Sequence, residues 1–363
     1  MLIHYGKKSE NKTDASDQQS LEETYEPFVS VVVPTHNEEM IIAKKIENLL
    51  SSNYPISKLE IIFVDDSDDS TPKIISDQSK KASNVSLIRF EKRMGYSPSM
   101  IAGCQAAKGE IVVLNDAGSF LDSDAIRNIV ARFRNSSIGV VTGKDVIINV
   151  NEEVGKSENF YQRIYNFLRT AETNMDSTFY VKGEATGVRR DLLKDLQLST
   201  ETFDTTVGLI ARQKGYRVVY DPQVKFFEYA PKTHSGRIKQ KTIRAANLIK
   251  VLWRFRHMMF NREYGKYGSL ILPINFALLT FIPVFVLAWF MFLVGLAFVD
   301  LGFAWIVWAT IGVVFVLALA FFRRFLLTFL EFEYSLLKAI YQVIFTSKTH
   351  DKIDKVDSTR RLT

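Results

Sequence analysis

Residues 61–69 read Ile61-Ile62-Phe63-Val64-Asp65-Asp66-Ser67-Asp68-Asp69, an apolar, β-branched run that ends in a cluster of carboxylates. The same change from apolar to polar follows residues 29–33, and again residues 111–114, where Asn115-Asp116-Ala117-Gly118 comes next. Buried strands that each end in a polar loop predict a site at the carboxyl edge of a sheet, where open α/β sheets bind ligands. Carboxylates at that edge hold a metal ion with a phosphorylated ligand, or accept a proton.

Helix and strand patterns alternate around this stretch. The predicted strands are residues 28–34, 59–64, 85–90 and 110–114. The predicted helices are residues 72–83 and 95–107, and one that follows residue 39 and ends near residue 51. This alternation predicts an α/β fold with a doubly wound, mainly parallel sheet. No strand is followed by the glycine fingerprint of dinucleotide-binding folds or by a Gly-Lys-Ser/Thr phosphate loop.

Composition narrows the class of protein. The chain has 363 residues, more than one typical domain, and a modest net charge of +6, and we predict no nucleic-acid partner. Cys104 is the single cysteine, which excludes a disulfide framework and a zinc-thiolate site within one chain. Residues 1–27 are mostly polar and lack a signal-peptide pattern, so we expect a disordered segment that stays in the cytosol.

An apolar region, residues 269–322, predicts a membrane anchor. Apart from Asp300 it is nearly free of charge, and two spans of about 20 residues each fit at roughly 270–297 and 303–322. Basic residues lie on both flanks, so the folded domain, the N-terminus and the C-terminus are predicted to be cytoplasmic. A buried helical hairpin in a soluble protein is the alternative interpretation.

Two amphipathic stretches border this anchor. Residues 245–268 mix aromatic, aliphatic and basic side chains, and residues 323–346 carry Glu331 and Glu333 on their polar side. Both are predicted to contain helices that lie along the headgroup layer. Helices packed on the folded domain are the alternative. Residues 347–363 are predicted to be a polar cytosolic tail.

Several segments carry a resemblance to a known family. Four of them resemble, in order, the donor-side motifs of family 2 glycosyltransferases. They read Ser30-Val31-Val32-Val33-Pro34-Thr35-His36-Asn37-Glu38-Glu39, Val64-Asp65-Asp66-Ser67-Asp68-Asp69-Ser70-Thr71, Arg93-Met94-Gly95 and Gly109-Glu110-Ile111-Val112-Val113-Leu114-Asn115-Asp116-Ala117-Gly118. A fifth, Thr202-Phe203-Asp204, falls where the branch of cellulose, chitin and hyaluronan synthases has Thr-Glu-Asp, and Gly215-Tyr216 follows at that branch's spacing. The resemblance covers about residues 28–250 and implies a GT-A catalytic domain over residues 28–244.

The resemblance implies roles for individual residues. Asp204 would be the catalytic base that takes the proton of the acceptor hydroxyl, and the anomeric configuration would invert in one displacement. Asp116 would approach the sugar nucleotide and its divalent ion, Mg²⁺ or Mn²⁺. Asp65 or Asp66 would accept hydrogen bonds from the nucleobase or ribose. The implied donor-binding residues are Pro34, Thr35, Asn37, Glu38, Asp65, Asp66, Arg93, Gly95 and Asp116. The implied acceptor-side or phosphate-side residues are Gly187, Gln240 and Arg244.

Three motifs depart from the family pattern. Gly118 stands where the last metal-binding Asp is usual, so metal coordination loses one carboxylate. Phe203 stands where Glu is usual. Gln240 fits the Gln-x-x-Arg-Trp motif of polymerising enzymes, but Ile243 and Arg244 occupy the Arg and Trp positions. The missing Trp argues against a processive cycle.

The resulting prediction is a membrane-anchored glycosyltransferase with a nucleotide-diphosphate sugar donor, UDP-sugars being favoured, and a lipid-linked or membrane-associated glycan acceptor. One alternative is a processive polysaccharide synthase, whose pore would need a homo-oligomer because two spans per chain are too few. Another is a polyprenyl-phosphate sugar synthase, since a phosphate nucleophile needs no base. The non-enzyme alternative is a membrane protein that only binds sugar nucleotides.

Overall fold

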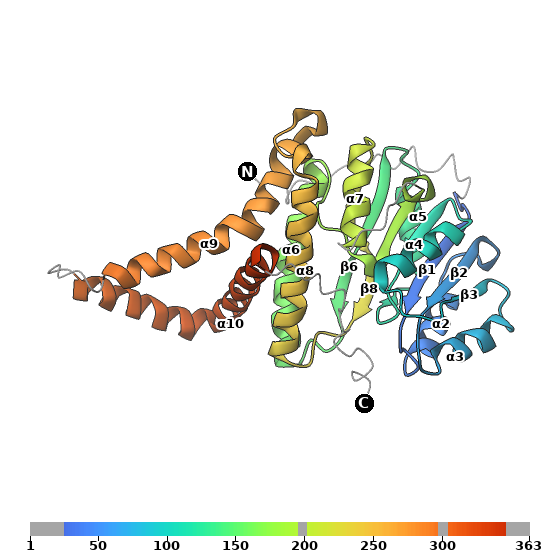
Figure 1. Ribbon diagram of the computed structural model, residues 1–363, viewed down its shortest axis with the longest axis horizontal. Helices are drawn as coiled ribbons and strands as arrows, with labels where there is room; N and C mark the ends of the chain where they lie inside the picture. Colours follow the sequence, from blue (N-terminus) through green and yellow to red (C-terminus); the bar gives the residue numbers. More distant parts are fainter. Residues whose placement is uncertain (1–24, 195–201, 297–303, 346–363) are drawn as a thin grey trace, which may run out of the picture.

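A computed structural model describes residues 25–194, 202–296 and 304–345. An eight-stranded sheet in the order β3-β2-β1-β4-β7-β6-β8-β5 forms its centre, with helices on both faces (Figure 1). The strands are β1 (Val29–Thr35), β2 (Leu59–Asp65), β3 (Val85–Arg89), β4 (Ile111–Leu114), β5 (Phe120–Leu121), β6 (Ile138–Ile147), β7 (Thr186–Arg189) and β8 (Arg217–Glu228). The helices are α2 (Ile42–Leu50), α3 (Thr71–Ser79), α4 (Tyr96–Ala106), α5 (Ala125–Arg132), α6 (Glu153–Met175), α7 (Phe203–Gln213), α8 (His234–Arg254), α9 (Leu272–Leu296) and α10 (Ala304–Phe345).

The sheet is mixed, with parallel ladders in the majority. β1 pairs in parallel with β2 and β4, and β2 with β3, as the alternating pattern predicts. β7 runs antiparallel to β4 and β6, and β5 runs antiparallel to β8. β6 and β8 are parallel again. The expectation of a mainly parallel sheet therefore holds best for β1 to β4, because the short strand β7 reverses direction after them.

Both faces of the sheet are buried, as expected for a doubly wound fold. Val29, Val31 and Val33 of β1 pack into a core with α2 and α5. Val32, on the opposite face, packs into a core with α4 and α7. Strands covered on both faces read as continuous apolar runs, which explains the composition of residues 61–64. The carboxyl ends of β1, β2 and β4 consequently meet at one edge of the sheet.

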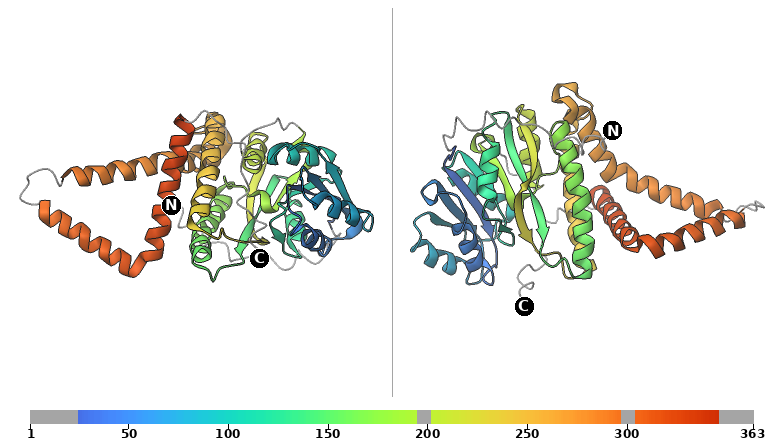
Figure 2. Two further views of the ribbon diagram at one scale, coloured as in Figure 1. Left: turned by 60° about the horizontal axis from the view of Figure 1, so that its bottom comes forward. Right: turned by 180° about the vertical axis from the view of Figure 1, so that it is seen from behind.

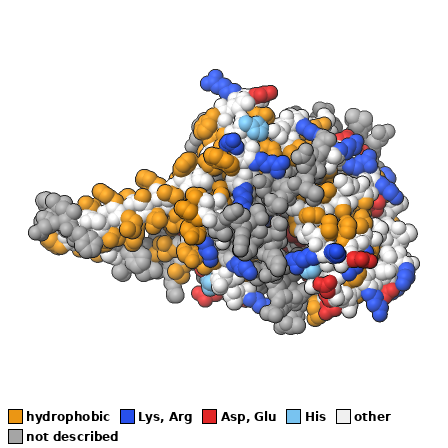
Figure 3. Space-filling model, in the orientation of Figure 1, with side chains coloured by type: hydrophobic (Ala, Val, Ile, Leu, Met, Phe, Trp, Pro, Cys, Tyr) orange, Lys and Arg blue, Asp and Glu red, His pale blue; other side chains and the backbone are white. Residues whose placement is uncertain are grey.

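Two long helices, α9 and α10, project from the domain (Figures 1 and 2). Among the described residues, one helical segment is long and apolar enough to cross a membrane, Tyr267–Leu296, with a mean hydropathy of 2.5 and 11% of its most apolar window buried. Hydrophobic side chains cover the described part of this projection (Figure 3). The first expected span therefore overlaps this segment. Residues 304–322 of the second expected span lie in α10, and that span stays a prediction.

The predicted amphipathic stretches belong to longer helices. Residues 245–254 end α8, and residues 323–345 end α10. Leu248 and Leu252 of α8 are buried with Leu336 of α10 in one apolar cluster, so these faces pack on the protein. Other side chains of the same helices face outward, among them Trp253, which is 59% exposed, and Tyr341, which is 60% exposed. The two helices thus combine a packed face with an exposed aromatic face.

Candidate active site

Asp65 ends β2 and is fully buried. Its Oδ1 lies 2.6 Å from Nη1 of Arg89 and accepts a hydrogen bond from the Ser67 N–H at 3.1 Å. Its Oδ2 accepts hydrogen bonds from the hydroxyls of Thr35, at 2.7 Å, and Ser67, at 2.6 Å. These four contacts match the acceptor capacity of a carboxylate. Asp65 thus joins the loops after β1 and β2, and its expected nucleotide contact stays a prediction.

Asp66 connects three segments of the expected donor side. Its Oδ2 accepts hydrogen bonds from the N–H groups of Met94, at 2.8 Å, and Gly95, at 3.1 Å. Its Oδ1 lies 2.9 Å from Nδ1 of His36, whose Nε2 is 2.7 Å from Nη1 of Arg93. Gly95 has a φ of +89°, a conformation that glycine adopts without strain. Asp66, Arg93 and Gly95 are thus brought together, as the motif order predicts.

The loop after β1 supplies the remaining donor-side residues. Asn37 has a φ of +54°, and its Oδ1 accepts a hydrogen bond from the Asp68 N–H at 2.9 Å. Pro34, Thr35 and Glu38 are buried. The Glu38 carbonyl accepts hydrogen bonds from the first turn of α2, at 3.0 and 2.9 Å. Asn37 is exposed at the edge of the loop, whereas the other three residues are buried beneath it.

Asp116 and Asp204 converge from distant parts of the chain. Asp116 follows β4, and Asp204 lies in the first turn of α7, where its Oδ2 accepts a hydrogen bond from the Gly183 N–H at 2.7 Å. The hydroxyl of Tyr96, at the start of α4, hydrogen-bonds Asp116. Burial, together with the charges of Asp116, Asp204 and Glu184, raises the pKa of Tyr96 well above its usual value. Tyr96 therefore stays protonated and can donate a hydrogen bond between these carboxylates.

Asp204 is electrostatically prepared to exchange a proton near neutral pH. Burial, and then the carboxylate of Glu184, raise its pKa to about 7 against the opposing effect of the Gly183 N–H. The charge of Asp116 raises it further. Perturbed carboxylates of this kind mark functional sites.

Arg244 of α8 faces the same cluster. Its Nη2 lies 3.0 Å from Oε1 of Glu184, which is 7% exposed in the turn Gly183–Ala185. Gln240 lies one turn earlier on α8 and is half-buried. Arg244 therefore places a guanidinium beside the group formed by Tyr96, Asp116, Glu184 and Asp204, called the candidate catalytic cluster below.

Gly187 is located differently from the expectation. It lies in β7, and a Cβ built there would be 2.2 Å from Cγ2 of Ile129 and 3.0 Å from Cε2 of Phe133. The glycine is needed for close packing of α5 on the sheet, and its expected acceptor-side role stays a prediction.

We expect Gly187→Ala to lower the free energy of unfolding by about 1–3 kcal/mol, the usual cost of overpacking a core. Chemical denaturation measures this loss. The KM for an acceptor should stay unchanged in the folded fraction. A raised KM without loss of stability would instead return Gly187 to the acceptor site.

Three residues of the site carry no signal that sequence motifs capture. Arg89 pairs with Asp65, and Tyr96 hydrogen-bonds Asp116 within electrostatic range of Asp204. Lys45 is fully buried beneath the loop after β4, where its Nζ donates a hydrogen bond to the Ser119 carbonyl. Burial lowers the pKa of Lys45 to about 7, although Asp116 opposes the shift. In the sequence, the burial of Lys45 is indicated only by its position on the apolar face of α2, among Ile42, Ile46 and Leu49.

Protein side chains alone do not build a closed metal site here. The described residues contain no group of three or more His, Cys, Asp or Glu side chains arranged to hold an ion. Mg²⁺ and related ions often bind through one or two carboxylates together with substrate phosphates. Asp116, half-buried at the carboxyl edge of β4, fits this second mode.

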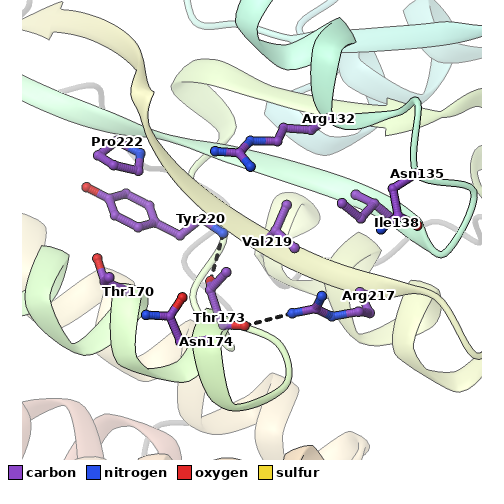
Figure 4. A pocket seen from close by; sticks show the side chains of 10 residues that line it. All are labelled: Arg132, Asn135, Ile138, Thr170, Thr173, Asn174, Arg217, Val219, Tyr220 and Pro222. Carbon is purple, nitrogen blue, oxygen red and sulfur yellow. Dashed lines mark hydrogen bonds between the residues drawn. The ribbon is translucent and has the colours of Figure 1, made fainter. Parts of the chain in front are cut away.

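Two hollows lie near the sheet. The larger, of about 480 Å³, is bordered by Ile138 and Arg217, the first residues of β6 and β8, and therefore lies at the amino edge, away from Asp116 (Figure 4). The smaller, of about 20 Å³, is lined by Tyr180 and Arg244, among others. It therefore adjoins the candidate catalytic cluster, because Arg244 pairs with Glu184.

The sequence was compared with known families once this geometry was established. Residues 30–197 match the family model described as glycosyl transferase family 2. These residues, less than half of the chain, thus resemble family 2 glycosyltransferases. The predicted resemblance to this family is confirmed over these residues.

Relatives of this family 2 domain include lipid and polysaccharide synthases. The β-monoglucosyldiacylglycerol synthase of Trichormus variabilis is 30% identical over 164 residues, which are 44% of this chain and 33% of the relative. The poly-β-1,6-N-acetyl-D-glucosamine synthase of Staphylococcus epidermidis is 26% identical over 231 residues, 62% of this chain and 56% of the relative. The chain thus matches between a third and about half of the length of these curated relatives.

A solved structure shares the fold. A mannosyltransferase from Pyrobaculum calidifontis, in complex with GDP-Man and Mn²⁺, superposes with a TM-score of 0.75 at 24% identity. The match covers 90% of this chain and 89% of that one. The mixed α/β architecture of the family 2 domain is consistent with a GT-A fold.

Proposed function

We propose that the protein is a membrane-bound, inverting glycosyltransferase that moves one sugar from a nucleotide-diphosphate donor to a lipid-linked or membrane-associated glycan acceptor. One observation carries the proposal. Asp204, a carboxylate with a pKa of about 7, shares the Tyr96 environment with Asp116 of the donor motif. A general base is most effective when its pKa lies near the operating pH. The base and the donor motif therefore belong to one reaction centre.

The donor would bind along the carboxyl edge of β1, β2 and β4. Asp66, Asn37 and Arg93 are the residues proposed to contact the nucleotide, with Gly95 giving close backbone access. Pro34, Thr35, Glu38 and Asp65 would hold the loops in shape from beneath. UDP-sugars remain the favoured donors because of the resemblance to the polymerising branch.

Asp116 is the residue proposed to hold Mg²⁺ or Mn²⁺ together with the donor phosphates. When bound, the ion would neutralise charge on the departing diphosphate. Lys45 lies close enough to Asp116 for the carboxylate to raise the pKa of the lysine.

Transfer would be a single displacement. The acceptor oxygen attacks the anomeric carbon on the face opposite the diphosphate, and the new C–O bond forms as the bond to the diphosphate oxygen breaks. The hydroxyl proton passes to Asp204, which the Gly183 N–H orients at 2.7 Å. The ion pair between Glu184 and Arg244 would fix the turn that carries Gly183.

The apolar helix α9 supports a membrane location. We propose that the region 269–322 contains two spans, that α8 and α10 place their exposed aromatic residues at the headgroup layer, and that the catalytic domain and both termini are cytoplasmic. Tryptophan and tyrosine favour this layer because one end of each ring system is apolar and the other is polar.

The proposal predicts nucleotide release that depends on both a donor and a membrane acceptor. Membranes containing the protein should release nucleotide from one of a panel of UDP- and GDP-sugars, with Mg²⁺ or Mn²⁺ present, at least tenfold faster than matched membranes without it. A phosphate-coupled assay of nucleotide release measures this rate. No release from any donor would contradict the proposed function.

A processive synthase is the second candidate, favoured by Gln240 and by the relative that makes poly-β-1,6-N-acetyl-D-glucosamine. Product length separates the two. One sugar per acceptor supports single transfer, whereas a ladder of products at limiting acceptor supports polymerisation, which would need a homo-oligomeric pore for export.

A further inference from the structure

Helices α6, α8, α9 and α10 meet in a seam beside the candidate catalytic cluster. The residues that line this seam are Tyr161, Gln162, Tyr165, Tyr180, Lys241, Arg244, Ala245, Leu248, Leu279 and Phe332. Leu279 belongs to the apolar helix α9, and Arg244 pairs with Glu184 next to Asp204. The seam therefore joins the membrane-facing helices to the reaction centre. Its free volume is about 20 Å³, so a bound acceptor must part α9 and α10 from α8.

A row of aromatic rings follows the seam. The ring centroids of Phe332 and Tyr161 are 5.5 Å apart, those of Tyr161 and Tyr165 are 4.6 Å apart, and those of Tyr165 and Tyr180 are 5.9 Å apart. Tyr180 lies within electrostatic range of Arg244, Glu184 and Asp204. Tyrosine rings offer an apolar face and a hydroxyl, which suits a ligand with both apolar and hydroxylated parts.

The cations of the seam already have carboxylate partners. Lys241 Nζ lies 2.6 Å from Glu158 and 3.6 Å from the centre of the Tyr161 ring, and Arg244 lies 3.0 Å from Glu184. Glu158 also pairs with Arg237 at 2.9 Å, and Arg237 in turn contacts Glu331 of α10. Burial lowers the pKa of Lys241 to about 8, although the charge of Glu158 opposes the shift. Phosphate recognition needs cationic donors that are not already neutralised.

The catalytic end of the seam is acidic. The charges of Asp116, Asp204 and Glu184 all raise the pKa of Tyr96. Glu228 interacts electrostatically with Glu184 and Arg244. An anionic nucleophile would approach these carboxylates against their repulsion, which is strong where water is excluded. A neutral hydroxyl meets no such barrier, and Asp204 can take its proton.

We propose that the seam is the acceptor site and that it selects an amphipathic lipid with an uncharged, hydroxyl-bearing head group over a lipid phosphate. This inference rests on the proposed function and specifies its acceptor. The apolar chains lie toward α9 and α10, the aromatic row contacts the head group, and the reacting hydroxyl reaches Asp204.

The direct test compares two acceptors of similar chain length in the same vesicles, with the donor found by the release screen. Diacylglycerol or a neutral glycosyl-diacylglycerol should be glycosylated at least tenfold faster than a polyprenyl phosphate. Faster transfer to the polyprenyl phosphate, or to a water-soluble glycan with neither lipid used, would overturn the inference while leaving glycosyl transfer intact. No transfer to any acceptor would overturn the proposed function as well.

A variant pair tests the seam itself. Tyr165→Leu removes one ring of the row and should raise the KM for the neutral lipid about five- to tenfold, with the KM for the donor unchanged. Tyr165→Phe keeps the ring and should restore most of the affinity. Phe167→Leu is the matched control, because Phe167 is on the same helix, outside the seam, and 43% exposed. An equal KM for Tyr165→Leu and the control would remove the acceptor from this seam.

Discussion

Replacing Asp204 by asparagine should lower kcat for sugar transfer by about 10²- to 10⁴-fold, the range typical of a lost general base. The amide keeps the size of the side chain and can still accept the hydrogen bond of the Gly183 N–H, which is 2.7 Å from Oδ2 in the wild type. What it loses is the ability to take a proton. Nucleotide release with a saturating acceptor measures the effect, and donor affinity should stay within about twofold.

The same variant changes the pH dependence in a defined direction. Asp204 acts as a base only when ionised, so kcat/KM of the wild type should rise as the pH increases through about 7, the pKa of the carboxyl. Asp204→Asn should lack this rise. Because the folded pKa lies above that of an unfolded aspartate, ionisation of Asp204 opposes folding as the pH rises. Asp204→Asn should therefore have a higher Tm than the wild type at pH 8, which also shows that the variant is folded.

Asp191→Asn is a suitable control because Asp191 is an exposed carboxylate that pairs with Lys194. It should leave kcat and the pH profile unchanged. Full activity of Asp204→Asn would indicate a nucleophile that needs no base, such as a lipid phosphate, and would contradict the assignment of Asp204.

The sequence allowed the sheet core and the convergence of the acidic loops to be predicted, because both follow from short local patterns. Continuous apolar runs identify β1 to β4, and parallel strands bring their polar ends to one edge. The antiparallel strand β7 was not foreseen, since its four residues, Thr186–Arg189, carry too little pattern. Its pairing depends on contacts with β4 and β6, which are distant in the sequence.

Individual roles within a motif were harder to predict than the motif itself. Asp65 and Asp66 are adjacent and chemically identical, yet one is enclosed by Arg89, Thr35 and Ser67, and the other faces the loop at Gly95. Successive side chains at a strand end point to opposite sides, and this alternation decides which aspartate is enclosed. A shift of one residue would exchange the environments of Asp65 and Asp66. At Gly187 the structure adds a packing requirement, close contact with Ile129 and Phe133, that the sequence did not reveal.

Asp116→Ala should lower transfer by about 10²- to 10³-fold, comparable to the loss of a group that stabilises transition-state charge. Asp116 is the one carboxylate left in the expected metal motif, since position 118 is glycine. Without it the donor phosphates would hold the ion alone, so excess Mn²⁺ should restore little activity. Titration of Mn²⁺ against nucleotide release measures both the loss and the response to the ion.

The converse variant, Gly118→Asp, adds a carboxylate to the expected metal motif and should increase the affinity for the ion. Gly118 follows Asp116 by two residues in the turn after β4. A second carboxylate beside Asp116 would coordinate the ion directly, and the Mn²⁺ concentration for half-maximal activity should fall about tenfold, as one additional favourable contact of roughly 1.4 kcal/mol implies. Wild-type activity that is unaffected by EDTA, with no response in Gly118→Asp, would instead mean that transfer proceeds without an ion and that Asp116 acts through its hydrogen bond to Tyr96.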